Sequence, residues 1–274
     1  MLVDHGGDGG PILLLHGLMG RGRTWQPCVP WLRRYGRVHT YDAPHHRGMA
    51  AANDHRGASG GGTAAQGDAI TTEAFVDDIA TTLAGWQEPA ILIGHSMGGL
   101  HAWCTAAAHP EKVRAIVVED MCPDYRGRTT QPWDAWFASW PAEFTDENEV
   151  LGMFGPVAGR YFLDSFDRTA AGWRLHGRID TWRAIANHWG TRDYWQQWQD
   201  VRCPALLVEG EHTLTIPGQM NDMASVQRAS WTDYLKVPGA GHLIHDEAPE
   251  EYRGAVEAFL SALPAGSRGA SRPG

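Results

Sequence analysis

Cysteine is scarce in this sequence, with four among 274 residues. The four are far apart, and no two form a C-x-x-C pair: Cys28, Cys104, Cys122 and Cys203. Disulfide frameworks and zinc sites depend on paired or regularly spaced cysteines, so this pattern predicts free thiols in a reducing compartment. We therefore expect a cytoplasmic protein.

Long apolar runs and a basic leader are also missing. No stretch approaches the ~18 apolar residues that a membrane helix requires. The chain begins with MLVDHGGDGG, which carries no positive charge cluster, and the apolar run at 11–15 is short for a signal peptide. We expect neither a targeting segment nor association with a membrane.

Basic residues are fewer than acidic ones. The chain has 23 Lys and Arg against 32 Asp and Glu, a formal net charge of −9. Arg126 and Arg128 form only a short basic pair, which Gly127 interrupts. Nucleic-acid binding needs clustered cations, so we expect no nucleic-acid partner.

A hydrophobic content of 43% is sufficient for a folded core.

Signatures of cofactor and metal sites are absent too. Residues 16–20 read HGLMG, which lacks the G-x-G-x-x-G of a dinucleotide site. His45, His46 and His55 lie near one another, but no carboxylate or cysteine completes a recognisable ligand spacing. The sequence therefore predicts no cofactor and no metal.

What the sequence does contain is an alternation of short apolar runs and helical periodicity. The runs at 11–15, 90–93, 113–118 and 205–208 are nearly continuous, as in strands buried on both faces. Phe75, Ile79 and Leu83 recur every four residues, which indicates an amphipathic helix over 74–83. Such an alternation predicts an α/β fold with a mostly parallel sheet and helices on both faces.

Two segments interrupt this alternation. Residues 50–68 are rich in Gly, Ala, Ser and Asn and indicate a long surface loop. Residues 123–200 contain no strand-like run and are expected to form a helical insertion, with most of their tryptophans in its core and a minority facing a pocket. These tryptophans are eight of the chain's thirteen: Trp133, Trp136, Trp140, Trp173, Trp182, Trp189, Trp195 and Trp198. The predicted organisation is a core formed by residues 1–122 and 201–264, a cap at 123–200 and a disordered tail at 265–274.

A G-x-S-x-G motif stands between the run at 90–93 and the helix predicted over 99–108. It reads Gly94-His95-Ser96-Met97-Gly98. In this context the motif predicts a nucleophile elbow, a turn so tight that its glycines leave room for neighbouring backbone. The turn would place the Ser96 hydroxyl above the sheet edge at a helix N-terminus.

A serine nucleophile needs a general base, which in this architecture follows it late in the chain. His242 comes after the strand predicted at 231–237, on the glycine-rich segment PGAGH. His245 is the alternative, and the preceding glycines favour His242.

The third member of a catalytic triad is an acid, and the segment that commonly carries it reads G-x-x-D-x-x-x-P. The corresponding segment is GEHTLTIP at 210–217, with Thr213 where the aspartate would stand. Asp120 follows the strand predicted at 113–118, and a carboxylate there lies at the carboxyl edge of the sheet, where such folds place their sites. We therefore predict Asp120 as the acid, with Glu119, Glu209 and Glu211 as alternatives.

An oxyanion hole needs two backbone N–H donors. Met97, directly after the nucleophile, would supply one. Leu18 would supply the other, because Gly17 lets the chain after the run at 11–15 approach closely. His16, Gly17 and His95 are then expected to contact the substrate.

With these residues in place, the chain resembles the α/β-hydrolase fold family from about residue 11 to residue 263. The resemblance is carried by HG at 16–17, GHSMGG at 94–99 and GAGH at 239–242. It implies an eight-stranded, mostly parallel sheet with residues 123–200 as a helical cap. Thr213 makes the chain similar to the subgroup whose acid follows the sixth strand. The segment DAPHHRG at 42–48 departs from the family's D-x-(R/P)-G-x-G-x-S, so we expect this loop to differ on its substrate side.

These observations lead to three hypotheses. The first is a serine hydrolase that cleaves a small or medium carboxylic ester through an acyl-enzyme, with Ser96, His242 and Asp120 as its triad and a small apolar or aromatic substrate. The second keeps the fold but makes it a C–C bond hydrolase or lyase with His242 as the principal base. The third, suggested only by Thr213, is a binding protein without turnover.

Overall fold

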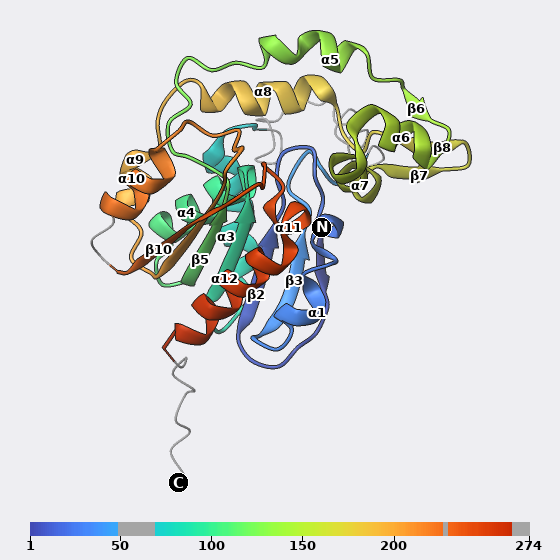
Figure 1. Ribbon diagram of the computed structural model, residues 1–274. Coiled ribbons are helices and arrows are strands. Elements are labelled where there is room, and N and C mark those ends of the chain that lie inside the picture. Colours follow the sequence, from blue (N-terminus) through green and yellow to red (C-terminus); the bar gives the residue numbers. More distant parts are fainter. Residues whose placement is uncertain (49–68, 227–229, 265–274) are drawn as a thin grey trace, which may run out of the picture.

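The computed structural model describes residues 1–48, 69–226 and 230–264. The loop predicted at 50–68 and the tail predicted at 265–274 lie outside these ranges. Within them, the chain forms one large sheet flanked by helices and covered at one end by a layer of shorter elements (Figure 1).

The main sheet has seven strands in the order β1-β3-β2-β4-β5-β9-β10. All neighbouring pairs are parallel except β1 with β3. The strands are β1 (Leu2–Asp4), β2 (Pro11–Leu15), β3 (Arg37–Tyr41), β4 (Ala90–His95), β5 (Val113–Glu119), β9 (Ala205–Gly210) and β10 (Thr232–Val237). The resemblance implied eight strands, and the described ranges contain seven in this sheet. The edge on the N-terminal side is the short and fully exposed β1.

The continuous apolar runs are explained by the two faces of this sheet. Along β2, Leu13 and Leu15 pack into one apolar cluster, while Ile12 and Leu14 pack into the cluster on the opposite face. Successive side chains of a strand point to opposite sides, so a strand covered on both sides needs apolar residues at every position. This is the arrangement predicted from the sequence.

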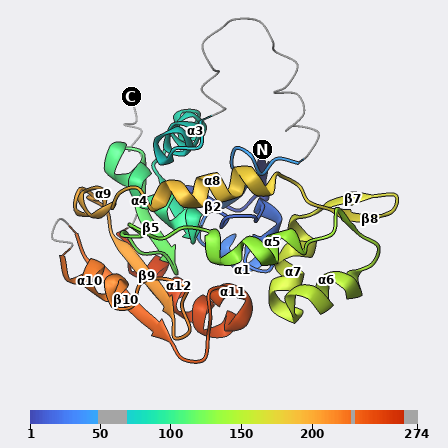
Figure 2. The ribbon, with the colours of Figure 1, turned by 90° about the horizontal axis from the view of Figure 1, so that it is seen from above.

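Helices cover both faces (Figures 1 and 2). The first cluster includes residues of α3, α4 and α10, and the second includes residues of α1, α11 and α12. The helices outside residues 123–200, with one 3₁₀ turn, are η1 (Gly22–Trp25), α1 (Val29–Leu32), α3 (Thr72–Ala84), α4 (Met97–Ala108), α10 (Gln219–Val226), α11 (Ile244–Glu247) and α12 (Pro249–Ala262). The Thr71 hydroxyl accepts a hydrogen bond from the Ala74 N–H and so caps α3 close to its predicted start.

Residues 123–200, which we call the cap, lie over the end of the sheet (Figures 1 and 2). Their helical elements are η2 (Gln131–Trp133), α5 (Asp134–Ala138), α6 (Glu147–Phe154), α7 (Pro156–Ser165), α8 (Ile179–Trp189) and α9 (Trp195–Gln199). Much of the cap packs around its own apolar cluster, which includes Phe144, Phe162 and Phe166 and reaches Leu243 beside His242. The cap therefore contacts the loop that carries the predicted general base.

The prediction that the cap contains no strand was wrong. Three short strands, β6 (Glu143–Phe144), β7 (Asp167–Thr169) and β8 (Gly172–Arg174), form an antiparallel sheet in the order β6-β8-β7. Strands of two or three residues are too short to show any hydrophobic periodicity, so the sequence gives no sign of them. The only local marker is Gly172, where a Cβ atom would lie 1.9 Å from the carbonyl oxygen of Phe144.

The cap tryptophans do not share one core. Trp140 and Trp173 pack in the cap cluster, whereas Trp182, Trp189 and Trp198 join the cluster on the sheet. The cap helices are therefore anchored to the sheet by large buried rings.

Candidate active site

Ser96 occupies the turn between β4 and α4. Its backbone has φ 52° and ψ −119°, a conformation that a residue with a side chain adopts only under strain. A Cβ atom at Gly94 would lie 2.2 Å from the Gly98 carbonyl oxygen, and one at Gly98 would lie 2.2 Å from that of Leu15. The glycines of the motif are thus required by close backbone approach, as a nucleophile elbow demands.

His242 lies on the loop between β10 and α11, and its imidazole is hydrogen-bonded to Asp120. Nδ1 of His242 is 2.6 Å from Oδ2 of Asp120. A carboxylate can only accept here, so Nδ1 carries the proton and Nε2 is left as the basic nitrogen. The His242 side chain is 23% exposed, while that of Asp120 is fully buried.

Asp120 is held firmly in this orientation. Its Oδ1 accepts a hydrogen bond of 3.0 Å from the Gly210 N–H, and its own N–H donates to the Val208 carbonyl at 2.8 Å. Its backbone φ of 47° ends β5 in a left-handed turn. The carboxylate is therefore anchored to the neighbouring strand β9, which leaves one oxygen for His242.

Glu119 and His245, the nearest competitors for the roles of acid and base, pair with each other. Nδ1 of His245 lies 2.8 and 2.9 Å from the two carboxylate oxygens of Glu119, and the His245 N–H also donates to Oε1 at 3.0 Å. Both side chains are completely buried. Burial alone would lower the pKa of His245, but the Glu119 carboxylate outweighs it and raises that pKa to about 9.

Glu209 and Glu211 are engaged away from His242. Glu209 accepts a hydrogen bond of 2.5 Å from the Tyr234 hydroxyl, and Glu211 accepts one of 2.8 Å from the Gly239 N–H. Neither carboxylate therefore competes with Asp120 for Nδ1 of His242.

Thr213 stands where the common pattern has its acid, and it serves a local purpose. Its hydroxyl accepts from the N–H of Thr215 and donates to the Thr215 hydroxyl, each at 2.9 Å. Thr213 therefore stabilises a turn in the loop after β9.

The residues predicted for the oxyanion hole surround the elbow. Met97 is the first residue of α4, so its N–H has no acceptor within the helix. Leu18 lines the cavity that contains Ser96. A Cβ atom at Gly17 would lie 2.6 Å from Nδ1 of His95, which explains why the chain before Leu18 needs glycine.

Of the three residues expected to contact the substrate, only His95 lines this cavity. Its Nε2 donates to the His242 carbonyl at 2.9 Å, and burial lowers its pKa well below the ordinary value. His16 is used differently from our expectation. Its Nδ1 donates to the Gly17 carbonyl and its Nε2 accepts from the Ala43 N–H, so both ring nitrogens hold loops together.

Tyr161, which the sequence did not point to, is brought by α7 from the cap to the elbow. Its hydroxyl lies in the space left by two glycines: Cβ atoms at Gly20 and Gly17 would approach it to 2.1 and 3.2 Å. Burial raises the pKa of this phenol, which therefore stays protonated. Nothing in the local sequence distinguishes Tyr161 from a packing residue, because Gly17 and Gly20, which surround its hydroxyl, lie near the N-terminus of the chain.

The cavity at the elbow has a volume of about 490 Å³ and lies between the sheet edge and the cap. It contains Ser96, His95 and His242, and its walls are mostly apolar side chains from the cap. Among the cap tryptophans, Trp133, Trp136 and Trp189 line it. The volume and lining are typical of a site for a small molecule.

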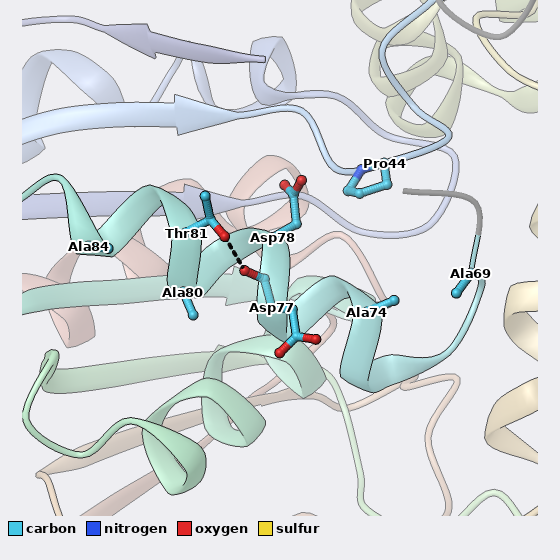
Figure 3. A pocket seen from close by; sticks show the side chains of 8 residues that line it. All are labelled: Pro44, Ala69, Ala74, Asp77, Asp78, Ala80, Thr81 and Ala84. Atoms are coloured by element: carbon cyan, nitrogen blue, oxygen red, sulfur yellow. Dashed lines mark hydrogen bonds between the residues drawn. The ribbon is translucent and has the colours of Figure 1, made fainter. Parts of the chain in front are cut away.

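A second cavity, also about 490 Å³, lies along α3 (Figure 3). Its lining consists of Pro44, Ala69 and mostly small side chains of α3, with Asp77 and Asp78 as its charged members. Asp78 is already engaged by Arg47 at 2.7 Å. None of the motif residues line this cavity, so we assign the candidate site to the first.

Membrane-spanning and metal-binding features are both missing from the described ranges. No helix in them combines the length and apolarity needed to cross a bilayer. No group of three or more potential metal ligands gathers in these same residues.

Comparison with known proteins identifies the family. Residues 12–255 match the model of the alpha/beta hydrolase family. The (E)-2-((N-methylformamido)methylene)succinate hydrolase of Acinetobacter baylyi is 25% identical over 94% of this chain and 93% of its own length. A pimeloyl-[acyl-carrier protein] methyl ester esterase of Xanthomonas campestris pv. campestris is 24% identical over 96% of this chain and all of its own length.

The solved structures show the same fold. The crystal structure of E-2-(acetamidomethylene)succinate hydrolase superimposes with a TM-score of 0.77, at 20% identity, over 95% of this chain and 94% of its own. A mostly parallel sheet with flanking helices is thus common to both proteins.

Proposed function

Because the chain belongs to the alpha/beta hydrolase family, we propose that it is a serine hydrolase that cleaves a small or medium carboxylic ester through an acyl-enzyme. One observation carries the proposal: the His242–Asp120 pair opens into the cavity that also contains Ser96. A histidine whose Nδ1–H is held by a carboxylate presents a basic Nε2, which is what a serine nucleophile requires. The hydrogen bond between Asp120 and His242 supports turnover, and it speaks against the binding protein that Thr213 alone suggested.

In the first half of the reaction, the Ser96 Oγ attacks the ester carbonyl carbon while Nε2 of His242 takes its proton. The carbonyl oxygen becomes an oxyanion, which the backbone N–H groups of Leu18 and Met97 stabilise. The bond to the alcohol oxygen then breaks, and His242 returns the proton to this leaving group. Asp120 keeps the tautomer of His242 and stabilises the imidazolium that forms.

In the second half, a water molecule gives a proton to Nε2 of His242 and attacks the acyl carbon. The bond between that carbon and Oγ breaks, the proton passes to Oγ, and the carboxylic acid leaves. Ser96 and His242 return to their starting states, so the net reaction consumes one ester and one water.

The walls of the cavity support a small substrate with an apolar or aromatic part. Most of the lining side chains are apolar, and several are aromatic. Two relatives described above are named as an (E)-2-((N-methylformamido)methylene)succinate hydrolase and a methyl ester esterase, and both names agree with a hydrolytic reaction. All four cysteines are free and buried, which supports a reducing, cytoplasmic location.

Covalent labelling tests the nucleophile. We expect incubation with a fluorophosphonate to add one adduct to the intact mass of the wild-type protein and none to that of Ser96→Ala. The same substitution should abolish hydrolysis of p-nitrophenyl esters. Circular dichroism of Ser96→Ala provides the control for folding.

The opposite results would redirect the proposal. An adduct that persists in Ser96→Ala would assign the reactive group elsewhere. Full turnover by Ser96→Ala would exclude an acyl-enzyme and favour C–C bond cleavage or elimination with His242 as the base.

A further inference from the structure

The cavity wall contains a short polar segment of the cap that the proposed reaction does not use. Arg128, Thr129 and Thr130 line the cavity together with the apolar side chains. They belong to the connection between β5 and η2, whereas His242 comes from the loop between β10 and α11 (Figure 1 shows these elements). A polar segment in a mostly apolar wall usually orients a ligand.

Arg128 has no carboxylate partner within the ranges that the structure describes. Arg126, only two residues away, has two: Asp124 at 2.7 Å and Asp193 at 3.3 Å. The two arginines are both exposed, but only Arg128 lines the cavity. The Arg128 guanidinium is therefore available to a bound anion, whereas that of Arg126 is already neutralised.

Thr130 provides an independent observation. The residue is 3% exposed, and its buried hydroxyl has no hydrogen-bond partner among the described residues. A buried hydroxyl without a partner loses free energy relative to its hydrated state, so such groups in folded proteins generally have one. Thr130 also lines the cavity, so a rotation of its side chain toward a ligand oxygen there would provide the partner.

The remaining charge in the cavity wall is Glu247, which cannot neutralise Arg128 from its place. Its two carboxylate oxygens accept hydrogen bonds from the N–H groups of Gly241 and Leu243, at 2.6 and 3.2 Å. The negative charge is thus held at the His242 loop and the positive charge at the cap. A substrate with one anionic end would be oriented by this arrangement.

We propose that Arg128 and Thr130 form a carboxylate-binding subsite, and that the natural substrate is an ester bearing a free carboxylate away from the scissile bond. This inference rests on the proposed ester hydrolysis. A guanidinium binds a planar carboxylate through two parallel N–H···O hydrogen bonds, and the Thr130 hydroxyl adds a third donor. The apolar walls would hold the chain between the carboxylate and the ester.

Kinetics with two matched probes test the subsite. Monomethyl adipate carries one free carboxylate, and dimethyl adipate replaces it by a neutral ester. We expect the wild-type protein to hydrolyse the monoester with the higher kcat/KM. Arg128→Gln should lower the ratio of the two kcat/KM values about 10- to 100-fold, mainly through KM, because it removes a charge-assisted contact. Thr130→Val should lower the ratio about fivefold.

Arg126→Gln is the matched control. It removes an exposed arginine of the same segment that lies outside the cavity, so the ratio should stay within about twofold of the wild-type value. A wild-type preference for the diester, or an unchanged ratio in Arg128→Gln, would overturn the proposal.

A binding measurement separates failure of the subsite from failure of the ester hydrolysis. In Ser96→Ala, titration with monomethyl adipate should change the fluorescence of the tryptophans that line the cavity, and Arg128→Gln added to this variant should weaken binding about tenfold or more. Specific binding without turnover of either ester by the wild-type protein would keep the subsite and reject the proposed function. Equal affinity for the two probes would reject the subsite.

Discussion

The end of β5 supports two histidine–carboxylate pairs that are nearly identical in chemistry and opposite in access. Asp120 pairs with His242, and its neighbour Glu119 pairs with His245, three residues further along the same segment. His242 lines the cavity, while His245 is completely buried and stacks on Trp25 with ring centroids 4.4 Å apart. The pairs lie side by side, since the His95 ring is 4.7 Å from that of His242 and 5.5 Å from that of His245.

Access to the cavity, and not the pairing with a carboxylate, therefore distinguishes His242, the predicted general base, from the buried His245. The His245 side chain is completely buried, and its Nε2 lies 3.6 Å from Oδ2 of Asp246, so this nitrogen has no route to a substrate. The Glu119 side chain binds the His245 segment, and the Glu119 carbonyl accepts the Ser96 N–H at 2.7 Å. The buried pair thus links the His242 loop to the nucleophile elbow.

The largest expected effect comes from the open pair. Asp120→Asn keeps an oxygen for the Gly210 N–H but presents an NH2 donor to Nδ1 of His242, which favours the tautomer with the proton on Nε2. We expect kcat for a p-nitrophenyl ester to fall about 10³- to 10⁴-fold, with a small change in melting temperature. Steady-state kinetics measures kcat and thermal unfolding measures the melting temperature. If Asp120→Asn turned over the ester at the wild-type rate, the role of the acid would belong to another residue.

The buried pair should respond in the reverse way. Glu119→Gln removes the charge that balances His245, and breaking a fully buried pair by removing one partner costs about 3 kcal/mol of unfolding free energy. The effect on kcat, measured at a temperature where the variant is folded, should stay within about tenfold. Urea unfolding and low-temperature kinetics test this, and a loss of kcat as large as that in Asp120→Asn would make the two pairs equivalent.

The same variant has a distinctive pH dependence. The pKa of His245 is about 9 in the folded protein and close to 6.5 in an unfolded chain. The stabilisation from this raised pKa is complete below about pH 6.5 and is lost as the pH rises through 9. The melting temperature of the wild-type protein should exceed that of Glu119→Gln most at pH 6 and least above pH 9. A difference that grows with pH would contradict this account of the pair.

The smallest effect is expected at Thr213. Thr213→Val removes two local hydrogen bonds with Thr215, which should lower the free energy of unfolding by about 1 kcal/mol and leave kcat within twofold. Unfolding and kinetic measurements on the purified variant check this. A loss of activity comparable to that of Asp120→Asn would return the acid role to the loop after β9.

Much of the fold and of the candidate site was predictable because it depends on local rules. The buried strands appear as short apolar runs, and the glycines around Ser96 mark a turn that only close backbone approach explains. Asp120 and His242 could be chosen from their positions after strands, since the carboxyl ends of parallel strands share one edge. The structure brings these two together, while their catalytic roles remain predictions.

Features that depend on contacts between distant segments could not be predicted. Tyr161 differs from its cap neighbours only through Gly17 and Gly20, which lie about 140 residues away in the chain. Arg126 and Arg128 look alike in the sequence, and only the folded chain pairs one with acids and leaves the other at the cavity. The strands of the cap are too short to leave a periodic pattern.

The sequence by itself determined the α/β architecture, the serine turn and the small set of acids and histidines able to serve it, because backbone sterics and strand burial act over a few residues. Only the tertiary structure decided which histidine opens to the cavity and which is enclosed. Glu119 and Asp120 are adjacent in the chain, and His242 and His245 are three residues apart. Which pair is buried and which faces the cavity therefore depends on the packing of Trp25 and the cap around them. The exposure of a side chain depends on the whole folded chain, so it cannot be predicted from a short segment of the sequence.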